Sequence, residues 1–405
     1  MTARRTKGSG SLRHLDGTRW QITVKAGGKR HSRTFEARNA TEAERLAAAV
    51  RVALVDDVQR VHTSEDASRE ERQGWTVKKY IAHYFAKWAP YNLAATTRER
   101  YRQLADNQVV PSLGKKKMAE VTPSDLARLY AKLAEPGANQ RNGKALSGLT
   151  IWHVHSFIEA VFPFAVEVEG DFESNPARKT KPNISRESRK PPAVDVATVE
   201  RFLAVAKKKA DPVLPGLTVP AHLGTRREET LALRWSDFDC ERKSVTIRRS
   251  VVHTKEDGTV IKSTKTGKVR TIPLDADMLD EFKALMKAQR ERRIAYGRGW
   301  RGAPSANDDY VCAAHDGALM TPDTYSYAVR CFANNNGFTD ISPGVLRHAW
   351  ISQMIALGFD AVTIASMSGH SAEVLLTTYA HAFDARKREA IDALAEARRQ
   401  AQTAE

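Results

Sequence analysis

Five residues in the second half of the chain have side chains that could act together on a phosphodiester. They are a tyrosine, two arginines, a lysine and a histidine: Tyr379, Arg226, Arg347, Lys265 and His370. A phenol is mostly protonated at neutral pH, so Tyr379 must lose a proton when it attacks. The leaving 5′-oxygen must gain a second proton. Without a metal ion, arginines and histidine or lysine donors can stabilise the charge of the transition state. The product would be a phosphotyrosine, which conserves the bond energy for religation.

The local sequence indicates how the first of these residues would be held. Arg226 lies in "HLGTRREETLALRWSD" three residues before Glu229, so we expect both on one face of a helix. Lys265 lies in a Lys-Thr-Gly turn at the tip of a predicted β-hairpin. Alone, the first pattern is usually a surface ion pair and the second a solvated lysine.

The remaining candidates lie near the C-terminus. Arg347 and His348 come at a helix start in "SPGVLRHAW", and His370 in "SMSGHS" precedes the helix that carries Tyr379. A single histidine of this kind usually caps or packs, and a single tyrosine usually belongs to the core. The joint occurrence of these residues favours a phosphate site over the separate structural explanations.

The composition is strongly basic. The 405 residues include 64 Lys and Arg against 48 Asp and Glu, a formal net charge of +16. This excess favours a nucleic-acid partner first and an anionic membrane second, with a merely basic protein as the alternative. We find no signal peptide in "MTARRTKGSGS" and no apolar run that approaches the ~18–20 residues of a membrane span. The scattered cysteines Cys240, Cys312 and Cys331 have neither disulfide nor zinc spacing, which favours reduced thiols in a cytoplasm.

Residues 1–60 resemble a small basic α/β module. The stretch "RWQITVKAGGKRHSRTF" predicts a β-hairpin, and "TEAERLAAAVRVALVDDV" predicts a helix with a capping box of Thr41 and Glu44. A basic strand face could lie against a DNA groove, or the hairpin could simply be solvated. The candidate DNA-binding residues are its basic side chains: Arg4, Arg5, Lys7, Arg13, Arg19, Lys25, Lys29, Arg30 and Arg33.

The rest of the chain predicts two larger domains. Residues 57–73 are polar and predict a linker, and 74–173 predict an all-α domain of four helices, two of them capped by Thr96 and Thr122. Residues 174–193 predict an extended basic linker that could follow phosphates. Residues 194–383 predict a mainly helical domain with a three-stranded antiparallel meander, and 384–405 predict a charged helix.

Residues 194–383 are similar to the catalytic domain of the tyrosine recombinases, the phage-integrase family. The similarity rests on "LGTRREETLALRWSD", "STKTGKVRTIPL", "LRHAW" and "SGHSAEVLLTTYAH", in the family's order and spacing. The all-α domain resembles the family's core-site-binding domain, and residues 1–60 resemble the arm-binding module of phage integrases. The implied fold is multidomain α+β.

The resemblance implies a role for each site residue. Arg226 and Arg347 would hold the non-bridging phosphate oxygens, and His370 would hydrogen-bond the phosphate. Lys265 would protonate the leaving 5′-oxygen, and Tyr379 would form a 3′-phosphotyrosine. Glu229 would orient its neighbours without acting as a catalyst, and no cofactor or metal is implied.

One position departs from the family pattern. The family usually has a histidine three residues before the second arginine, and here that position is Gly344. We expect His348 to be a poor replacement, because neighbouring helix positions point about 100° apart. Loss of a general acid–base group would reduce the rate by ~10²–10⁴.

Three functions therefore compete at the level of sequence. The first is a site-specific recombinase, or integrase, that exchanges strands through a four-way junction and integrates or excises a mobile element such as a phage. The second is a recombinase-like DNA-binding protein weakened by Gly344, and the third is a type IB topoisomerase. For the first, the resemblance implies a homotetramer on DNA attachment sites in a bacterial cytoplasm. It also implies a host DNA-bending protein and an excisionase as possible partners. The helix at 384–405 would be a contact between protomers.

Overall fold

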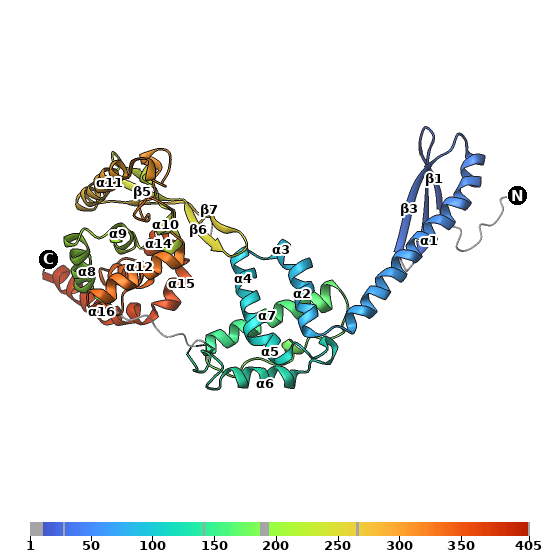
Figure 1. The fold of residues 1–405 in the computed structure, drawn as a ribbon, viewed down its shortest axis with the longest axis horizontal. Helices are drawn as coiled ribbons and strands as arrows, with labels where there is room; N and C mark the ends of the chain where they lie inside the picture. The colour runs from blue at the N-terminus through green and yellow to red at the C-terminus, as the bar shows by residue number, and fades with distance from the viewer. Residues whose placement is uncertain (1–10, 27–28, 141, 187–193, 265–266, 404–405) are drawn as a thin grey trace. The chain divides into compact units, whose positions relative to one another are not determined.

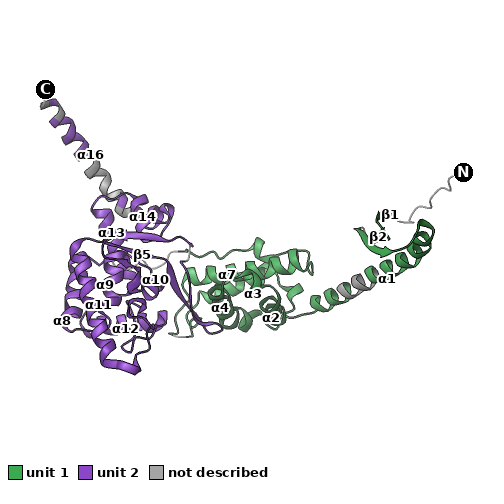
Figure 2. Ribbon diagram, turned by 90° about the horizontal axis from the view of Figure 1, so that it is seen from above, with its two compact units in different colours: residues 1–188 green, residues 189–405 purple. Residues whose placement is uncertain are grey.

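The computed structural model describes residues 11–26, 29–140, 142–186, 194–264 and 267–403. The chain divides into two compact units, residues 1–188 and 189–405 (Figure 2). Both consist mainly of helices with small antiparallel sheets (Figure 1). This is the α+β character that the sequence predicts.

An antiparallel sheet in the order β1-β2-β3 opens the first unit. Its strands are β1 (Ser11–Asp16), β2 (Arg19–Ala26) and β3 (Lys29–Glu36). Ile22 and Val24 alternate along β2 and pack on helix α1 (Ala40–Gln73) through Ala47 and Leu54. The pairing of β2 with β3 confirms the predicted hairpin on the described residues, and β1 adds a third strand.

Two predictions about α1 were wrong. The helix is capped by Asn39, whose side chain accepts a hydrogen bond from the backbone of Glu42, so Thr41 is not the cap. It also continues through 57–73, which we predicted as a linker. This stretch is polar but contains neither glycine nor proline, so nothing in it interrupts the helix before Gly74.

The predicted all-α domain has the helices α2 (Val77–Lys87), α3 (Ala89–Asn92), α4 (Ala95–Leu104), α5 (Val110–Leu113), α6 (Pro123–Leu133) and α7 (Gly148–Pro163). A π-helical turn, Ala105–Val109, joins α4 to α5. Thr122 caps α6 as predicted, but α4 begins before Thr96 and has no side-chain cap. Tyr80, Tyr84 and Phe157 are fully buried in the core of this domain.

Helix α7 also corrects our statement about apolar runs. Together with a π-helical turn at Phe164–Val168 it is long and apolar enough, by length and composition, to cross a membrane, and half of that stretch is buried in the protein. Ile151, Val154 and Phe157 lie in the core of the helical domain, which is the pattern of a core helix.

The segment predicted as an extended linker at 174–193 is partly folded onto the first unit. A 3₁₀ turn, Pro176–Lys179, buries Ala177 against the helical core. Further along, Trp152 donates a hydrogen bond to the carbonyl of Ile184, and the guanidinium of Arg186 stacks over the Trp152 ring at 3.5 Å. Residues 187–193 lie outside the described residues.

The second unit contains the candidate site. Its helices are α8 (Val196–Lys208), α9 (Leu214–Leu223), α10 (Arg227–Ala232), α11 (Ala276–Tyr296), α12 (Pro322–Asn335), α13 (Pro343–Ala356), α14 (Ala361–Ser368), α15 (Ala372–Thr378) and α16 (Ala380–Thr403). Helix α16 extends away from the rest of this unit (Figure 2), and its residues 391–400 are exposed.

The predicted three-stranded meander was wrong in its pairing. The described strands are β4 (Phe238–Asp239), β5 (Ser244–Ile247), β6 (Arg249–Thr254), β7 (Gly258–Ser263) and β8 (Arg270–Pro273). β6 and β7 form a separate two-stranded hairpin, whereas β8 pairs with β5 in the order β4-β5-β8. A break at Arg248 divides the first predicted strand, so β5 can pair with β8 while β6 continues into the hairpin (Figure 1).

Candidate active site

Arg226 is held at the start of α10 by contacts to its backbone and its side chain. Its backbone N–H and Nη1 donate to the two carboxylate oxygens of Glu229, each at 2.9 Å, and Nη2 donates to the carbonyl oxygen of Gly369. Gly224, two residues earlier, has a φ of +57°, and a Cβ there would lie 2.4 Å from the Trp350 ring. The glycine in "LGTR" therefore lets the backbone before Arg226 pass against Trp350.

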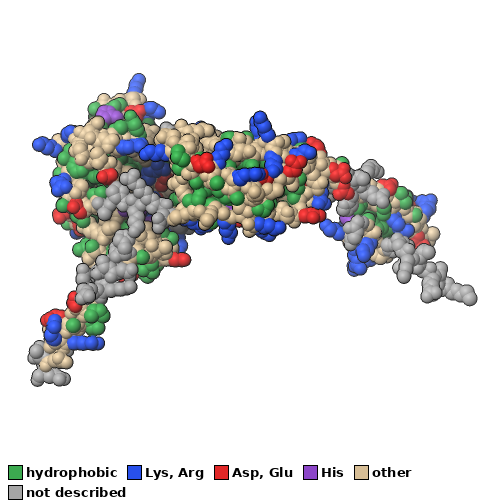
Figure 3. All heavy atoms as spheres, turned by 90° about the horizontal axis from the view of Figure 1, so that it is seen from below, with side chains coloured by type: hydrophobic (Ala, Val, Ile, Leu, Met, Phe, Trp, Pro, Cys, Tyr) green, Lys and Arg blue, Asp and Glu red, His purple; other side chains and the backbone are tan. Residues whose placement is uncertain are grey.

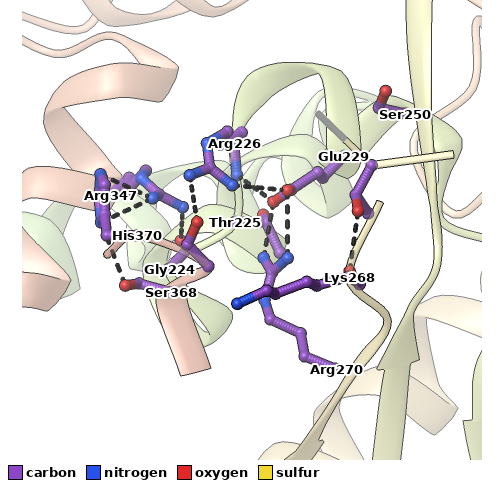
Figure 4. Close-up of polar contacts among 12 residues, drawn as sticks. Gly224, Thr225, Arg226, Glu229, Ser250, Lys268, Arg270, Arg347, Ser368 and His370 are labelled. Atoms are coloured by element: carbon purple, nitrogen blue, oxygen red, sulfur yellow. Dashed lines mark hydrogen bonds and ion pairs between the residues drawn. The ribbon is translucent and has the colours of Figure 1, made fainter. Parts of the chain in front are cut away.

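A second arginine, which we had not singled out, completes the contacts of Glu229. Arg270 in β8 donates from Nη2 and Nη1 to the Glu229 carboxylate at 2.6 and 3.1 Å (Figure 4). Its Nε donates to the carbonyl of Met367 at 2.7 Å. Burial alone would raise the pKa of Glu229, but Arg270 and Arg226 together lower it. One ionised carboxylate thus orients two arginines. The only sequence signal was the arginine in "VRTIPL", directly after the lysine turn.

Arg347 and His370 lie together beside Arg226. Nη2 of Arg347 lies 3.0 Å from each ring nitrogen of His370, and Nη1 donates to the carbonyl of Gly224. Burial, and then the charge of Arg226, lowers the pKa of Arg347 to about 10, so it remains a cation at neutral pH. Burial and the charges of Arg347 and Arg226 lower the pKa of His370 to about 3, so its imidazole is neutral.

Tyr379 ends α15 and is 5% exposed. Its ring belongs to the hydrophobic cluster of Trp350, Ile351 and Leu375. Burial raises the pKa of its phenol to about 12, although the charge of nearby Arg347 lowers it in part. The phenol is therefore on the same side of the domain as the arginines and is fully protonated at neutral pH.

The expectation that His348 is turned away from the site was wrong. Nδ1 of His348 is hydrogen-bonded to the Tyr379 hydroxyl, and the two ring centroids lie 5.7 Å apart. The 100° step does separate His348 from Arg347 around α13, but Tyr379 lies on the side that His348 faces. No sequence pattern indicates this contact, because it joins residues from two different helices.

Gly344, in the first turn of α13, has room for a side chain. A Cβ at this position would meet Ser342 Oγ at 3.8 Å. Lys265 lies outside the described residues. Lys268, three residues later, is exposed.

The register of the N-terminal sheet divides the predicted DNA-binding residues between two faces. Ile22 and Val24 mark the face toward α1, so Arg13, Arg19, Lys25 and Arg30 lie on the open face, and Lys29 and Arg33 on the helix side. Arg33 pairs with Asp57 of α1 at 2.7 Å, in agreement with this division. Arg4, Arg5 and Lys7 lie outside the described residues.

The charge of the described surface is mixed. On the face drawn in Figure 3, Lys and Arg side chains are spread over the protein, with Asp and Glu side chains among them. On that face the described basic side chains do not gather into one large patch.

Two family models match the chain. The phage integrase family matches residues 195–386, and the N-terminal SAM-like domain of phage integrases matches residues 76–134. A prophage phiRv2 integrase of Mycobacterium tuberculosis is 23% identical over 386 residues, covering 94% of this chain and 93% of the relative. A XerC-like tyrosine recombinase of Caldanaerobacter subterraneus is 23% identical over 295 residues, covering 69% of this chain and 72% of the relative.

Solved structures share the fold. An integrase of the transposon Tn1549, in complex with transposon right end DNA, aligns with a TM-score of 0.61 at 19% identity over 79% of this chain and 99% of its own. A lambda integrase tetramer bound to a Holliday junction aligns with a TM-score of 0.52 at 14% identity over 89% of this chain and 95% of its own. With the clustered arginines, histidines and tyrosine, these matches assign the activity: the chain belongs to the phage integrase family and is a tyrosine-type site-specific DNA recombinase.

Proposed function

We propose that Tyr379 cleaves DNA at a phosphodiester held by the arginines of its own chain. Its oxygen attacks phosphorus, the bond to the 5′-oxygen breaks, and a 3′-phosphotyrosine forms. The observation that carries this proposal is the packing of Tyr379 against α13, with its hydroxyl on His348, the neighbour of Arg347. Tyr379 and Arg347 of one chain lie close enough to interact electrostatically, which supports cleavage within one protomer.

The site gathers positive charge from arginine side chains. One guanidinium nitrogen of Arg226 and one of Arg347 donate to backbone carbonyls, those of Gly369 and Gly224. A phosphate oxygen could accept from the same guanidinium groups. Neutral His370 would donate one N–H to the phosphate. These donors are held by the fold before DNA binds, which is the condition for effective electrostatic catalysis. Lys265 would protonate the 5′-oxygen as it leaves.

The other parts of the chain would serve binding and assembly. Residues 74–173 would bind the core site, and the open face of the sheet in residues 1–60 would bind arm-type sites. Four protomers would exchange strands between two attachment sites, through a four-way junction, to integrate or excise a mobile element. Helix α16 would contact a neighbouring protomer. A bacterial cytoplasm would be the setting, where a host DNA-bending protein and an excisionase would set the direction.

Covalent trapping tests this proposal. Nicked duplexes made from DNA flanking the gene would lose a short 5′-hydroxyl fragment after cleavage, so that religation is prevented. We expect a protein–DNA band on a denaturing gel with the natural chain and none with Tyr379→Phe. A band of equal intensity with Tyr379→Phe would show that another residue is the nucleophile. Equal binding of both proteins to an intact duplex is the control for folding.

A further inference from the structure

The hydroxyl of Tyr379 has a nitrogen partner that the roles above do not use. Nδ1 of His348 is hydrogen-bonded to this hydroxyl. Among the described residues, the hydroxyl has no other hydrogen-bond partner. The two rings belong to α13 and to the end of α15, which pack in one hydrophobic cluster with Trp350 and Leu375. The contact is therefore fixed by the core and not by a flexible surface side chain.

A base at this position has a chemical task. Burial raises the pKa of the Tyr379 phenol to about 12, so at neutral pH the nucleophile carries a proton that must leave during attack. Arg347 and Arg226 are cations and cannot accept it. The position three residues before Arg347, which could otherwise present an imidazole, is Gly344.

The surroundings of His348 keep it unprotonated. Burial, and then the charge of Arg347, lowers its pKa from the usual 6.5. The titratable or charged groups that interact with it are Arg347 on its own helix, His370 before α15, and Tyr379. None of these is an anion at neutral pH, so no neighbour favours the imidazolium. With the ring proton on Nε2, Nδ1 accepts the hydrogen bond from the phenol.

We propose that His348 is the general base that takes the phenolic proton of Tyr379 during DNA cleavage. As the Tyr379 oxygen bonds to phosphorus and the bond to the 5′-oxygen breaks, the proton moves from the phenol to Nδ1. Lys265 would give the leaving 5′-oxygen its proton. In religation the 5′-hydroxyl attacks and returns that proton to Lys265, the bond between the phenol oxygen and phosphorus breaks, and the imidazolium returns its proton to Tyr379. This inference rests on the proposed role of Tyr379.

The test is single-turnover cleavage by the full-length protein on the nicked duplex. His348→Gln keeps an acceptor for the hydroxyl but cannot take a proton, and His348→Ala leaves space for free imidazole. We expect losses of ~10²–10⁴ in cleavage rate for both variants, and recovery of His348→Ala, but not of Tyr379→Phe, with added imidazole. The control is His315→Ala, because His315 makes the same type of contact, to the Tyr296 hydroxyl, on an exposed part of the same unit.

The pH dependence separates proton transfer from positioning. The rate of the natural chain should fall as the pH drops through the pKa of His348, below 6.5, and His348→Gln should lack this decrease. His348→Gln leaves His370 in place, so a decrease that is absent only from this variant is due to His348. Cleavage by His348→Gln within threefold of the natural rate, with an unchanged pH profile, would overturn the proposal. A band with Tyr379→Phe would instead overturn the role of the tyrosine itself.

Discussion

Glu229 of α10 and Arg270 of β8 form a 2.6 Å ion pair whose side chains are only 1% and 8% exposed. The same carboxylate binds Arg226, and Arg270 also binds the carbonyl of Met367, at the end of α14. The pair therefore connects the first arginine of the site with the segment that leads to His370. We infer that the pair positions the arginines, since the Glu229 side chain is buried and bound by both of them.

Replacing Glu229 with glutamine should destabilise the second unit and reduce cleavage. Removing one partner of a buried charged pair costs about 3–5 kcal/mol, because the remaining charge is left uncompensated. Calorimetry of the full-length chain should show a lower melting temperature for the transition of the second unit. Arg242→Ala, which removes an exposed pair with Asp239, is the control and should leave the transition nearly unchanged.

The same variant changes the pH dependence of stability. The pKa of Glu229 is lowered in the folded chain, so its contribution is complete above its unfolded pKa of 4.5 and is lost as the pH falls through the folded value. We expect this loss on acidification in the natural chain and a smaller one in Glu229→Gln. Identical acid profiles for the two proteins would mean that the pair does not contribute to stability.

Gly369→Ala should damage the site by a steric route. Gly369 has a φ of +73°, and a Cβ there would lie 2.9 Å from Nη1 of both Arg226 and Arg270. Gly337→Ala is the matched control, because its φ is +81° and a Cβ would meet nothing within 4 Å. Both variants should lose about 1–2 kcal/mol to backbone strain, but only Gly369→Ala should lose cleavage at equal DNA binding. Equal cleavage by the two variants would contradict this account of the arginines.

Residue type and spacing were sufficient to propose candidate residues for the site but not to describe their contacts. Tyr379, Arg226, Arg347 and His370 were found from residue type and spacing, and the structure brings them to one side of the second unit. The pairing of β8 with β5 and the contact of Arg270 with Glu229 join distant parts of the chain, which local periodicity does not encode. The contact between His348 and Tyr379 was missed for the same reason. The 100° step around α13 is correct, but it does not give the position of Tyr379 at the end of α15.

Gly344→His should have a modest effect. A Cβ at 344 meets only Ser342 Oγ at 3.8 Å, so the variant should fold. Because His348 already contacts the nucleophile, we expect cleavage to rise by less than about tenfold, far below the ~10²–10⁴ of a missing acid–base group. Gly344→Ala separates the effect of the imidazole from that of a more stable helix. A gain of a hundredfold in the trapping assay would mean that the natural site lacks its proton-transfer group, against the role given to His348.

The two faces of the N-terminal sheet predict different effects on DNA binding. Arg30 lies on the open face, whereas Arg33 lies on the helix side and pairs with Asp57. If the open face binds phosphates, Arg30→Ala should weaken binding and reduce the slope of log affinity against log salt by about 1, since one fewer counterion is released. Arg33→Ala should leave that slope unchanged, because its guanidinium is directed to α1.

The measurement is a salt titration of the affinity of the full-length chain for DNA that flanks the core site. A slope left unchanged by Arg30→Ala would contradict phosphate binding by Arg30 on the open face, and a slope near zero for the natural chain would argue against phosphate binding altogether.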